Sequence, residues 1–176
     1  MKIYLTTDTH FGHEKMKAYC DRPDNFEQII FKNLQVVKKG DVIIHLGDFC
    51  IGRDEYWHDL FMELIDGKKW LIKGNHDGKS NSWYMDHGWD FVCSKFQDRF
   101  YGKNVLFSHT PVFDDREIKS LLYATEGFDI NIHGHYHNNV HRSSEKDMIA
   151  RITPKHRLLS IENANYKPVF LEEFIK

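Results

Sequence analysis

The amino-acid sequence predicts an α/β fold, with either one mixed β-sheet or two packed sheets flanked by helices. Two observations predict this fold. Short apolar runs of strand length alternate with helical patterns in the first half of the chain, and hairpin-like neighbouring strands follow in the second half. The chain has 176 residues, of which 41% are hydrophobic, and no long polar linker divides it. We therefore expect one domain that spans residues 1–176.

The first half of the chain predicts repeated βαβ units. Its expected strands are short apolar runs at residues 2–7, 42–46 and 69–73. The helices expected between them carry apolar residues on one face and cover residues 24–40 and 54–65. We expect Asp24 and Glu27 to form a capping box at the start of the first helix, and Gly40 to end it. An Asp66-Gly67 turn leads from the second helix into the third strand.

The second half predicts further strands and fewer helices. The expected strands are residues 89–94, 96–101, 104–108, 128–133 and a segment around 158–162. A turn at Gly102-Lys103 would join the second and third of them. Residues 80–87 predict a short helix or a loop, and residues 114–124 predict a helix. Residues 138–157 hold five Lys or Arg against two acidic residues, a net charge of +3, and we expect weak order there.

The composition excludes several classes of protein. The formal net charge is -2, which argues against binding nucleic acid or membrane by bulk charge alone. The mean hydropathy is -0.57 and no apolar run has the length of a membrane span. The N-terminus lacks the pattern of a signal peptide, and the three cysteines lack CxxC spacing. We therefore expect a cytoplasmic protein with reduced thiols.

Five of the expected strands run directly into polar clusters. The clusters are Asp8-Thr9-His10, Gly47-Asp48, Gly74-Asn75-His76-Asp77, Ser108-His109 and His133-Gly134-His135-Tyr136-His137. Ligands of open α/β sheets bind outside the carboxyl ends of the strands. Each cluster alone is a weak signal, because an Asp after a strand is commonly a turn or a helix cap. Their joint occurrence predicts that all five converge on one crevice.

The residue types in these clusters predict a metal centre. They combine carboxylate and amide oxygens with imidazole and contain no cysteine, which suits Mn²⁺, Fe or Zn²⁺ better than a thiolate site. Two carboxylates, one Asn and at least four His exceed what one ion can use. We therefore expect two divalent ions bridged by one Asp, an arrangement that serves phosphoester hydrolysis. Mn²⁺ is favoured, with Fe, Zn²⁺ and Ni²⁺ as alternatives.

The order D-x-H, G-D, G-N-H-D, H and G-H-x-H resembles the calcineurin-like metallophosphoesterase superfamily over residues 8–137. The start TDTHFGH and the end NYKPVFLEE are similar to small stand-alone bacterial and phage members. The resemblance implies a four-layer αββα sandwich, in which two sheets lie face to face with helices outside. This architecture agrees with the mixed arrangement predicted from the strands and helices.

The resemblance also implies a role for each polar residue. The ligands of one metal would be Asp8, His10, Asp48 and His137. The ligands of the other would be Asp48, Asn75, His109 and His135, with Asp48 as the bridge. A shared hydroxide, its pKa lowered by both ions, would attack phosphorus in line. His76 would stabilise the phosphoryl charge or protonate the leaving oxygen, and Asp77 would orient His76.

Two departures from the family pattern narrow the expected activity. The segment from Gly47 to Arg53 reads GDFCIGR instead of G-D-x-x-D-R, and Asp77 stands where the protein phosphatases have Glu. Both departures argue against protein phosphatase activity. Arg53 and His13 are candidate substrate-binding residues. The alternative for Arg53 is a solvated position at the start of a helix, and the alternative for His13 is a surface loop. The remaining histidines with an expected structural role are His45, His58 and His133.

The resemblance favours a metal-dependent phosphodiesterase or phosphomonoesterase that acts on a small phosphoester. The alternative is a nuclease or RNA-processing enzyme whose partner is a nucleotide or short nucleic acid, with the basic stretch at residues 138–157 as a phosphate track. A third hypothesis is a non-catalytic adaptor, against which the intact ligand pattern and His76 argue. No membrane partner is expected. The natural substrate and the oligomeric state are left open by the sequence.

Overall fold

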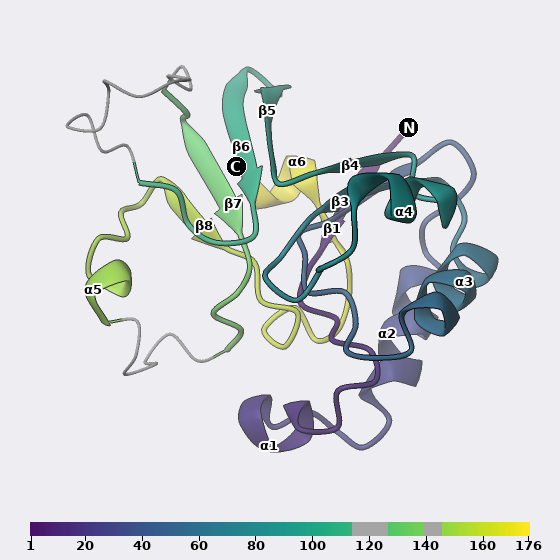
Figure 1. The fold of residues 1–176 in the computed structure, drawn as a ribbon. Coiled ribbons are helices and arrows are strands. Elements are labelled where there is room, and N and C mark those ends of the chain that lie inside the picture. The colour runs from purple at the N-terminus through teal and green to yellow at the C-terminus, as the bar shows by residue number, and fades with distance from the viewer. Residues whose placement is uncertain (114–126, 139–145) are drawn as a thin grey trace.

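In the computed structural model, which describes residues 1–113, 127–138 and 146–176, the strands form two mixed sheets (Figure 1). The first sheet has the order β4 (Phe91–Cys93), β3 (Lys68–Ile72), β2 (Val42–His45), β1 (Ile3–Thr6) and β9 (Val169–Phe170). Strands β1 to β4 pair in parallel, and β9 runs antiparallel to β1. The parallel pairing confirms the βαβ units that the sequence predicts.

The second sheet has the order β5 (Lys95–Phe100), β6 (Lys103–Ser108), β7 (Ile130–His133) and β8 (His156–Leu158). Strands β5 and β6 form an antiparallel hairpin, whereas β6, β7 and β8 are parallel. The hairpin turn lies at Tyr101 and Gly102, where φ is 49° and 82°, so it begins one residue earlier than the predicted Gly102-Lys103 turn. Two successive positive φ values are typical of the turn type that matches the twist of a two-residue hairpin.

Helices flank the first sheet. The described helices are α1 (Met16–Cys20), α2 (Phe26–Leu34), α3 (Asp54–Leu64), α4 (Asn81–Asp86), α5 (Lys146–Ile149) and α6 (Leu171–Phe174). Helix α4 settles the choice between helix and loop near residues 80–87, because the Ser80 hydroxyl accepts a hydrogen bond of 3.1 Å from the Trp83 backbone N–H and caps the helix. In Figure 1, α2 and α3 lie on the side of the first sheet that faces away from the second sheet.

Alternate residues of the strands build two hydrophobic cores. Tyr4 and Ile43 belong to the core beneath α2, α3 and α4, which also contains Phe61. Their neighbours Leu5 and Ile44 point to the opposite face and belong to a second core, which also contains buried residues of β6 and β7. Because this second core draws on both sheets, the sheets pack face to face. The structure thus confirms two mixed sheets with flanking helices.

The predicted capping box of α2 is wrong. The helix begins at Phe26, and its N-cap Asn25 makes no side-chain cap hydrogen bond. The Glu27 carboxylate instead accepts a hydrogen bond of 2.8 Å from the Gly12 backbone N–H, and Asp24 pairs with Lys17 at 3.3 Å. Tertiary partners therefore take both side chains of the predicted box. The helix also ends at Leu34, before the predicted stop.

Several other predictions differ from the structure or lie outside its description. The strand expected around residues 158–162 is β8, which ends at Leu158. The stretch from 146 to 157 contains α5 and the start of β8, so this part of the basic segment is more ordered than predicted. Residues 139–145 and the helix expected over 114–124 lie outside the described residues. The short elements α1, β9 and α6 had no sequence signal, since elements of two to five residues are too short to show a period.

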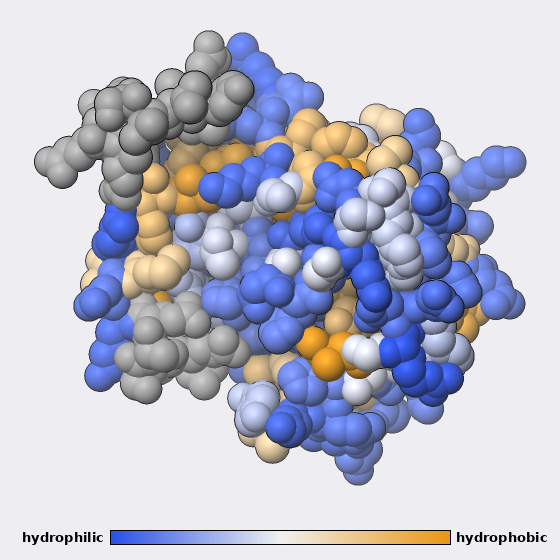
Figure 2. Space-filling view, viewed as in Figure 1, coloured by the Kyte–Doolittle hydropathy of each residue, from blue (hydrophilic) through white to orange (hydrophobic). Residues whose placement is uncertain are grey.

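Hydrophilic residues predominate on the face of the molecule shown in Figure 2. Within the described ranges, no helix has both the length and the apolar character needed to cross a membrane. Large exposed apolar side chains such as Tyr19, Met85 and Tyr101 come from separate elements. Isolated residues of this kind are ordinary on a protein surface.

Candidate metal centre

The five polar clusters follow the carboxyl ends of β1, β2 and β3 in the first sheet and of β6 and β7 in the second. Backbone hydrogen bonds tie the loops together. The Asp8 N–H donates to the Gly47 carbonyl at 2.9 Å, and the His10 N–H donates to the Asp48 carbonyl at 3.1 Å. Within the second sheet, the Gly134 N–H donates to the His109 carbonyl at 3.0 Å, and across the two sheets the His135 N–H donates to both carboxylate oxygens of Asp8, at 3.2 and 3.0 Å. The predicted convergence on one site is therefore present in the fold.

Two glycines of the motifs are required by close approach of the loops. A Cβ atom on Gly74 would clash with the Asp48 side chain and backbone. A Cβ atom on Gly134 would clash with the Asp8 carboxylate and the Thr7 hydroxyl. The glycines before Asn75 and His135 thus leave room for the two carboxylates, which gives a physical reason for the G-N-H-D and G-H-x-H patterns.

The backbone is strained at the candidate ligands. Five of them adopt the left-handed region, with φ between 47° and 73°: Asp8, His10, Asp48, His135 and His137. Such conformations are unfavourable for residues other than glycine and persist where the surrounding structure enforces them. Here the His135 N–H donates to both oxygens of Asp8, at 3.2 and 3.0 Å, and the loops bond to each other. Half of the non-glycine residues that have a positive φ in the described ranges are therefore candidate ligands.

One cluster of possible ligands comprises Asp8, His10 and His137, all buried. The Asp8 Oδ1 atom lies 4.0 Å from His10 Nε2 and 3.6 Å from His137 Nε2. The Thr7 hydroxyl donates to the other carboxylate oxygen of Asp8 at 2.6 Å. The rings of His10 and His137 stack with centroids 5.1 Å apart. One carboxylate oxygen and two imidazole nitrogens therefore face a common point.

A second cluster comprises Asp48, His109 and His135, with Asn75 beside them. The His109 Nδ1 atom lies 2.8 Å from the Leu46 carbonyl, which places the proton on Nδ1 and leaves Nε2 as an acceptor in the neutral ring. This Nε2 atom lies 3.1 Å from Asn75 Oδ1, 3.1 Å from His135 Nδ1 and 3.2 Å from Asp48 Oδ2. Two acceptor oxygens and a second imidazole nitrogen thus lie within hydrogen-bonding distance of one ring nitrogen.

The carboxylate of Asp48 lies between the two clusters. Its Oδ1 atom accepts a hydrogen bond of 2.9 Å from the His76 backbone N–H. Its Oδ2 atom lies 3.6 Å from His10 Nε2 on one side and 3.2 Å from His109 Nε2 on the other. The hydrogen bond to Oδ1 therefore fixes the orientation of the carboxylate, and with it the position of Oδ2, the oxygen that faces both clusters.

The donor set fits divalent cations. One proton on His109 Nε2 can serve only one of the acceptors around it, whereas a cation with several coordination positions can bind them all. Asp8 and Asp48 are 0% and 2% exposed, and buried carboxylates require pairing or a metal. Oxygen and imidazole donors without thiolate in either cluster suit Mn²⁺, Fe or Zn²⁺.

The carboxylates shift the pKa values of the neighbouring histidines. Burial opposes protonation of His109, but its hydrogen bond to Asp48 and the charges of Asp8 and Asp48 outweigh burial and raise its pKa to about 9. Burial lowers the pKa of His10 to about 2. Burial by itself would raise the pKa of Asp48. The hydrogen bond from His109 and the charge of His109 nevertheless hold that pKa below its usual range. The site thus favours positive charge beside its carboxylates.

His76 lies at the opening of the site. Its side chain is 44% exposed, its Nε2 atom is 4.0 Å from Asp48 Oδ2, and its ring meets the His10 ring edge-on at 5.4 Å. His76 is thus the exposed histidine next to the buried clusters. A polar group in this position can reach a molecule that enters from solvent.

The expectation that Asp77 orients His76 needs correction. The Asp77 carboxylate accepts hydrogen bonds from the backbone N–H groups of Asp48, Phe49 and Gly74, at 2.8, 3.1 and 2.7 Å. It therefore joins the loops that follow β2 and β3. Burial raises its pKa, although the three hydrogen bonds oppose this shift. Asp77 is a structural support of the site, and its contacts are with backbone groups that sequence reasoning could not see.

Sequence reasoning missed two further charged residues at the site, Arg22 and Glu162. The Glu162 Oε1 atom lies 3.0 Å from His137 Nδ1 and accepts hydrogen bonds from Arg22. Burial acts against ionisation of Glu162, but its bonds to His137 and Arg22 lower its pKa to about 2. An isolated Arg and a Glu separated by 140 residues carry no motif, so the sequence offered no signal for this pair.

The two candidate substrate-binding residues lie in different surroundings. His13 is half-buried next to His10, with ring centroids 5.7 Å apart. Arg53 is exposed at the start of α3, and its guanidinium stacks over the Tyr56 ring at 4.1 Å. The structure thus brings His13 to the cluster and leaves Arg53 at a groove that Lys79 and Trp83 also line.

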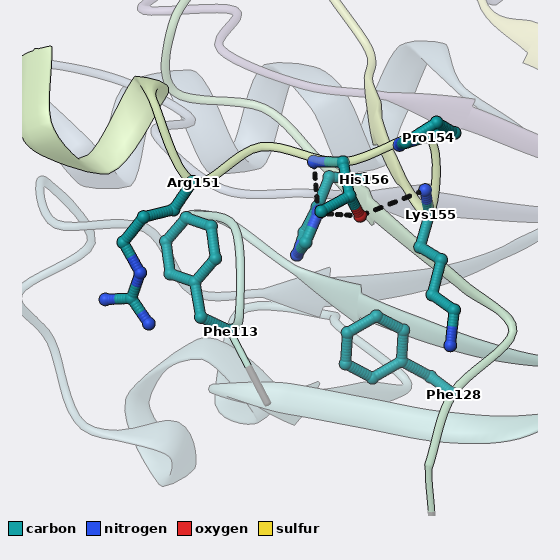
Figure 3. Close-up of a pocket in the computed structure, with 7 residues that line it drawn as sticks. Phe113, Phe128, Arg151, Pro154, Lys155 and His156 are labelled. Carbon is teal, nitrogen blue, oxygen red and sulfur yellow. Dashed lines mark hydrogen bonds between the residues drawn. The ribbon is translucent and has the colours of Figure 1, made fainter. Parts of the chain in front are cut away.

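A cavity of about 490 Å³ lies apart from the candidate ligands (Figure 3). Its lining residues are Phe113, Phe128, Arg151, Thr153, Pro154, Lys155 and His156. Figure 3 shows Arg151 and Lys155 on opposite sides of the aromatic rings. The His156 ring is fixed by contacts of Nε2 with the Val112 carbonyl at 2.9 Å and of Nδ1 with the Thr153 N–H at 3.1 Å. The cavity is therefore aromatic and cationic, in contrast to the carboxylate-rich site.

The chain matches the model of a known protein family. The family model described as the calcineurin-like phosphoesterase superfamily domain matches residues 1–154. The chain belongs to this superfamily. The match confirms the resemblance found in the motifs, and the two mixed sheets are those expected of a calcineurin-like phosphoesterase.

Relatives extend the likeness over nearly the whole chain. An uncharacterized protein of Methanocaldococcus jannaschii is 32% identical over an alignment of 188 positions, gaps included, which covers 99% of this chain and 90% of that protein. A crystal structure of a protein of unknown function from Aquifex aeolicus is 28% identical, covers 99% of this chain and 97% of that chain, and has a TM-score of 0.74. An archaeal phosphodiesterase is 23% identical over 77% of this chain and 73% of its own, with a TM-score of 0.44, a likeness too weak to bear on function.

Proposed function

We propose that this calcineurin-like phosphoesterase is a dinuclear metal-dependent hydrolase of a small phosphoester, with a phosphodiester favoured over a monoester. The observation that carries the proposal is the position of Asp48. Its Oδ2 atom lies 3.6 Å from His10 Nε2 in one cluster and 3.2 Å from His109 Nε2 in the other. A carboxylate between two sets of ligands is the arrangement expected of a bridge between two ions.

Each cluster would hold one ion, and both would share Asp48. The ligands of the first would be Asp8, His10 and His137, and those of the second would be Asn75, His109 and His135. Two divalent ions supply Lewis acidity toward phosphoryl oxygens and the activation of water for in-line displacement. We favour Mn²⁺ because the donors are oxygens and imidazoles, and such a set also accepts Fe, Zn²⁺ or Ni²⁺.

His76 would act on the substrate and not on the metals. Its exposed ring next to His10 can donate a hydrogen bond to a phosphoryl oxygen or a proton to the leaving oxygen. Its position is set through the backbone, because its own N–H donates to Asp48 Oδ1 at 2.9 Å. The residue would therefore hold its place whether or not its imidazole is present.

The proposal is tested by linking metal content to hydrolysis. The purified chain would be stripped with chelator, reloaded with Mn²⁺, and assayed on an aryl phosphodiester and an aryl phosphomonoester while bound metal is counted by mass spectrometry. We expect two ions per chain and faster hydrolysis of the diester. Two bound ions without hydrolysis of either ester would favour the non-catalytic adaptor. A chain that binds no ion would contradict the metal centre itself.

A nucleic-acid substrate is the second candidate function. The cavity in Figure 3 combines the rings of Phe113 and Phe128 with two cations, and the Arg151 guanidinium stacks over Phe113 at 4.2 Å. Aromatic platforms with neighbouring cations are typical of proteins that bind single-stranded nucleic acid. One cation of the basic stretch is committed elsewhere, because Arg157 donates a hydrogen bond to the Phe174 carbonyl.

Salt dependence separates this candidate from a small-molecule phosphodiesterase. Binding of a short RNA or single-stranded DNA should weaken steeply as salt rises, and Arg151→Ala or Lys155→Ala should lower the slope of log K against log salt by about 0.7 each. Lys39→Ala changes an exposed lysine outside the cavity and is the matched control. Binding that does not depend on salt, or that responds equally to all three variants, would exclude the cavity as a phosphate track.

A further inference from the structure

We infer that Glu162 is a positioning residue that fixes His137 as a metal ligand, and that Arg22 couples this support to the loop of Asp8. The inference rests on the proposed metal centre. It concerns two buried charged residues to which the motifs assign no role. It makes the ion in the first cluster dependent on the C-terminal part of the chain.

The first step is the orientation of His137. Its Nδ1 atom lies 3.0 Å from Glu162 Oε1, and its Nε2 atom lies 3.6 Å from Asp8 Oδ1. A carboxylate accepts hydrogen bonds and cannot donate them when ionised, so the proton of the neutral ring resides on Nδ1. The lone pair of Nε2 then points toward Asp8. A carboxylate behind a metal-binding histidine fixes both its tautomer and its orientation.

The second step is that Glu162 is itself fixed. Arg22 donates to Glu162 Oε1 from Nε at 2.9 Å and from Nη2 at 2.6 Å, and the side chains of this pair are 0% and 5% exposed. The Ser160 hydroxyl donates to the other oxygen at 2.9 Å. Both carboxylate oxygens therefore have partners, as a buried ionised group requires.

The third step joins this pair to the other ligand loop. The Arg22 Nη1 atom donates to the Thr9 carbonyl at 2.7 Å, and Nη2 donates to the Asp8 carbonyl at 2.6 Å. The Arg22 guanidinium thus contacts the backbone between the candidate ligands Asp8 and His10. It also contacts the Glu162 carboxylate, which lies behind the candidate ligand His137. The fork geometry of arginine suits such multiple bonds, whereas a lysine would provide one point charge.

A third metal is the alternative role for this group. Cys20, His137 and Glu162 have atoms within 4.8 Å of one another and could hold an ion. The Arg22 guanidinium, however, already places a fixed cation against Glu162 at 2.6 Å and lies 3.5 Å from His137 Nδ1. A divalent ion there would face this charge at close range. We therefore assign the pair to positioning.

The decisive variant is Glu162→Gln, compared with Glu162→Ala and with Glu63→Gln on the exposed face of α3 as the matched control. Mn²⁺ affinity would be measured by titration calorimetry, and the ion pair by the exchange-coupled electron paramagnetic resonance signal of two Mn²⁺. We expect affinity for one of the two ions to fall about 10–100-fold in the Gln variant, and further in the Ala variant. The other ion should bind as in the wild type.

Selective loss of one ion separates positioning from general damage to the fold. A merely structural role of Glu162 would weaken both ions together and lower the melting temperature of the metal-free chain in proportion. Should Glu162→Gln not fold, Ser160→Ala removes the 2.9 Å bond to Glu162, together with the 3.2 Å hydrogen bond that the Ser160 hydroxyl accepts from the Asn163 N–H, and should weaken the same ion several-fold. Cys20→Ala should change the number of bound ions only if the alternative third site exists.

The outcomes distinguish this inference from the proposed function. Equal Mn²⁺ affinity of wild type and Glu162→Gln for both ions overturns the positioning role and leaves the hydrolase proposal intact. If the wild type binds two ions but hydrolyses neither ester, the hydrolase proposal is overturned and the positioning role stays intact. A third ion that disappears in Cys20→Ala overturns the positioning role in favour of a metal site.

Discussion

Within the part of the chain that the structure describes, two regions with buried histidines differ in the kind of surroundings that they give the ring. In the core beneath the helices of the first sheet, His58 is 1% exposed, and its Nδ1 atom accepts a hydrogen bond of 2.9 Å from Trp89 Nε1. In the loops that hold the candidate ligands, His109 Nε2 lies 3.1 to 3.2 Å from two acceptor oxygens and from the Nδ1 atom of His135. The core pairs a donor with an acceptor, whereas the loops gather acceptors.

This difference teaches which buried histidines indicate a ligand site. Burial, helped by the charge of His87 and opposed by that of Asp54, lowers the pKa of His58 to about 4, as expected of a ring that stays neutral in a core. The carboxylates around His109 reverse this effect and raise its pKa to about 9. A surplus of acceptors and negative charge, and not the number of histidines, marks the place where a cation belongs.

Replacing the shared carboxylate should abolish the site. Asp48→Ala removes the oxygen that faces both clusters, so we expect loss of both ions and a fall in turnover of more than about 10⁴-fold, as for other groups on which the whole catalytic assembly depends. Asp8→Ala removes a residue of one cluster only and is the matched comparison. Metal counting and hydrolysis of the aryl diester check both variants. If the Asp48→Ala chain still binds two ions, Asp48 is not the carboxylate that the two metal sites share.

Replacing the exposed histidine should affect turnover without affecting the metals. His76→Ala removes a ring that contacts the opening of the site, and we expect kcat to fall about 10²–10⁴-fold with metal content unchanged. His87→Ala on the stacked Trp83–His87 pair of the α4 region is a control outside the site. Loss of metal from the His76 variant would place this histidine among the ligands, contrary to our assignment.

Removing divalent ions should destabilise the loop cluster. The bound ions would neutralise carboxylates that are 0% and 2% exposed, so each ion should stabilise the folded chain by about 2.7 kcal/mol, and the two together by about 5.4 kcal/mol, when free Mn²⁺ is 100-fold above the dissociation constant of each site. Melting curves with Mn²⁺ and with chelator measure the effect. Asp48→Ala should show no such shift, and a wild-type chain that melts at the same temperature in both conditions would argue against a bound cation.

The sequence could identify the candidate ligands because each follows the end of a strand. Asp8, Asp48 and Asn75 stand after consecutive parallel strands, so the topology alone predicts that they meet. The supports of these residues could not be predicted in the same way. Asp77 binds backbone N–H groups, and Glu162 reaches the site through a long-range pair with Arg22. Such contacts have no local pattern.

The same reasoning explains the errors in the fold prediction. The capping box at α2 was locally plausible, but Glu27 bonds to Gly12 in the loop that follows the first ligands. Strand β8 ends at Leu158 because the chain then turns, with the Ser160 hydroxyl accepting from the Asn163 N–H at 3.2 Å and donating to Glu162. In both places the requirements of the site outweigh local propensity.

The smallest predicted effect is the pH dependence of the core histidine. The ordinary pKa of 6.5 falls to about 4 for His58 in the folded chain because burial disfavours the charged ring. Below pH 6.5 the unfolded chain therefore binds a proton that the folded chain does not, so the free energy of unfolding should decrease as pH falls, by about 2 kcal/mol at pH 5. Asp54, His87 and Trp89 face this ring, and the charge of Asp54 acts against the decrease.

Denaturant unfolding in chelator at pH 7.5 and pH 5 measures this dependence. His58→Gln removes the titrating ring, so the loss of stability between the two pH values should be smaller in the variant by about 2 kcal/mol. The other buried histidines contribute equally to both chains and cancel in the difference. Equal pH dependence of the two chains would mean that His58 charges as readily in the core as in water, and the contrast between a satisfied core histidine and a ligand histidine would then fail.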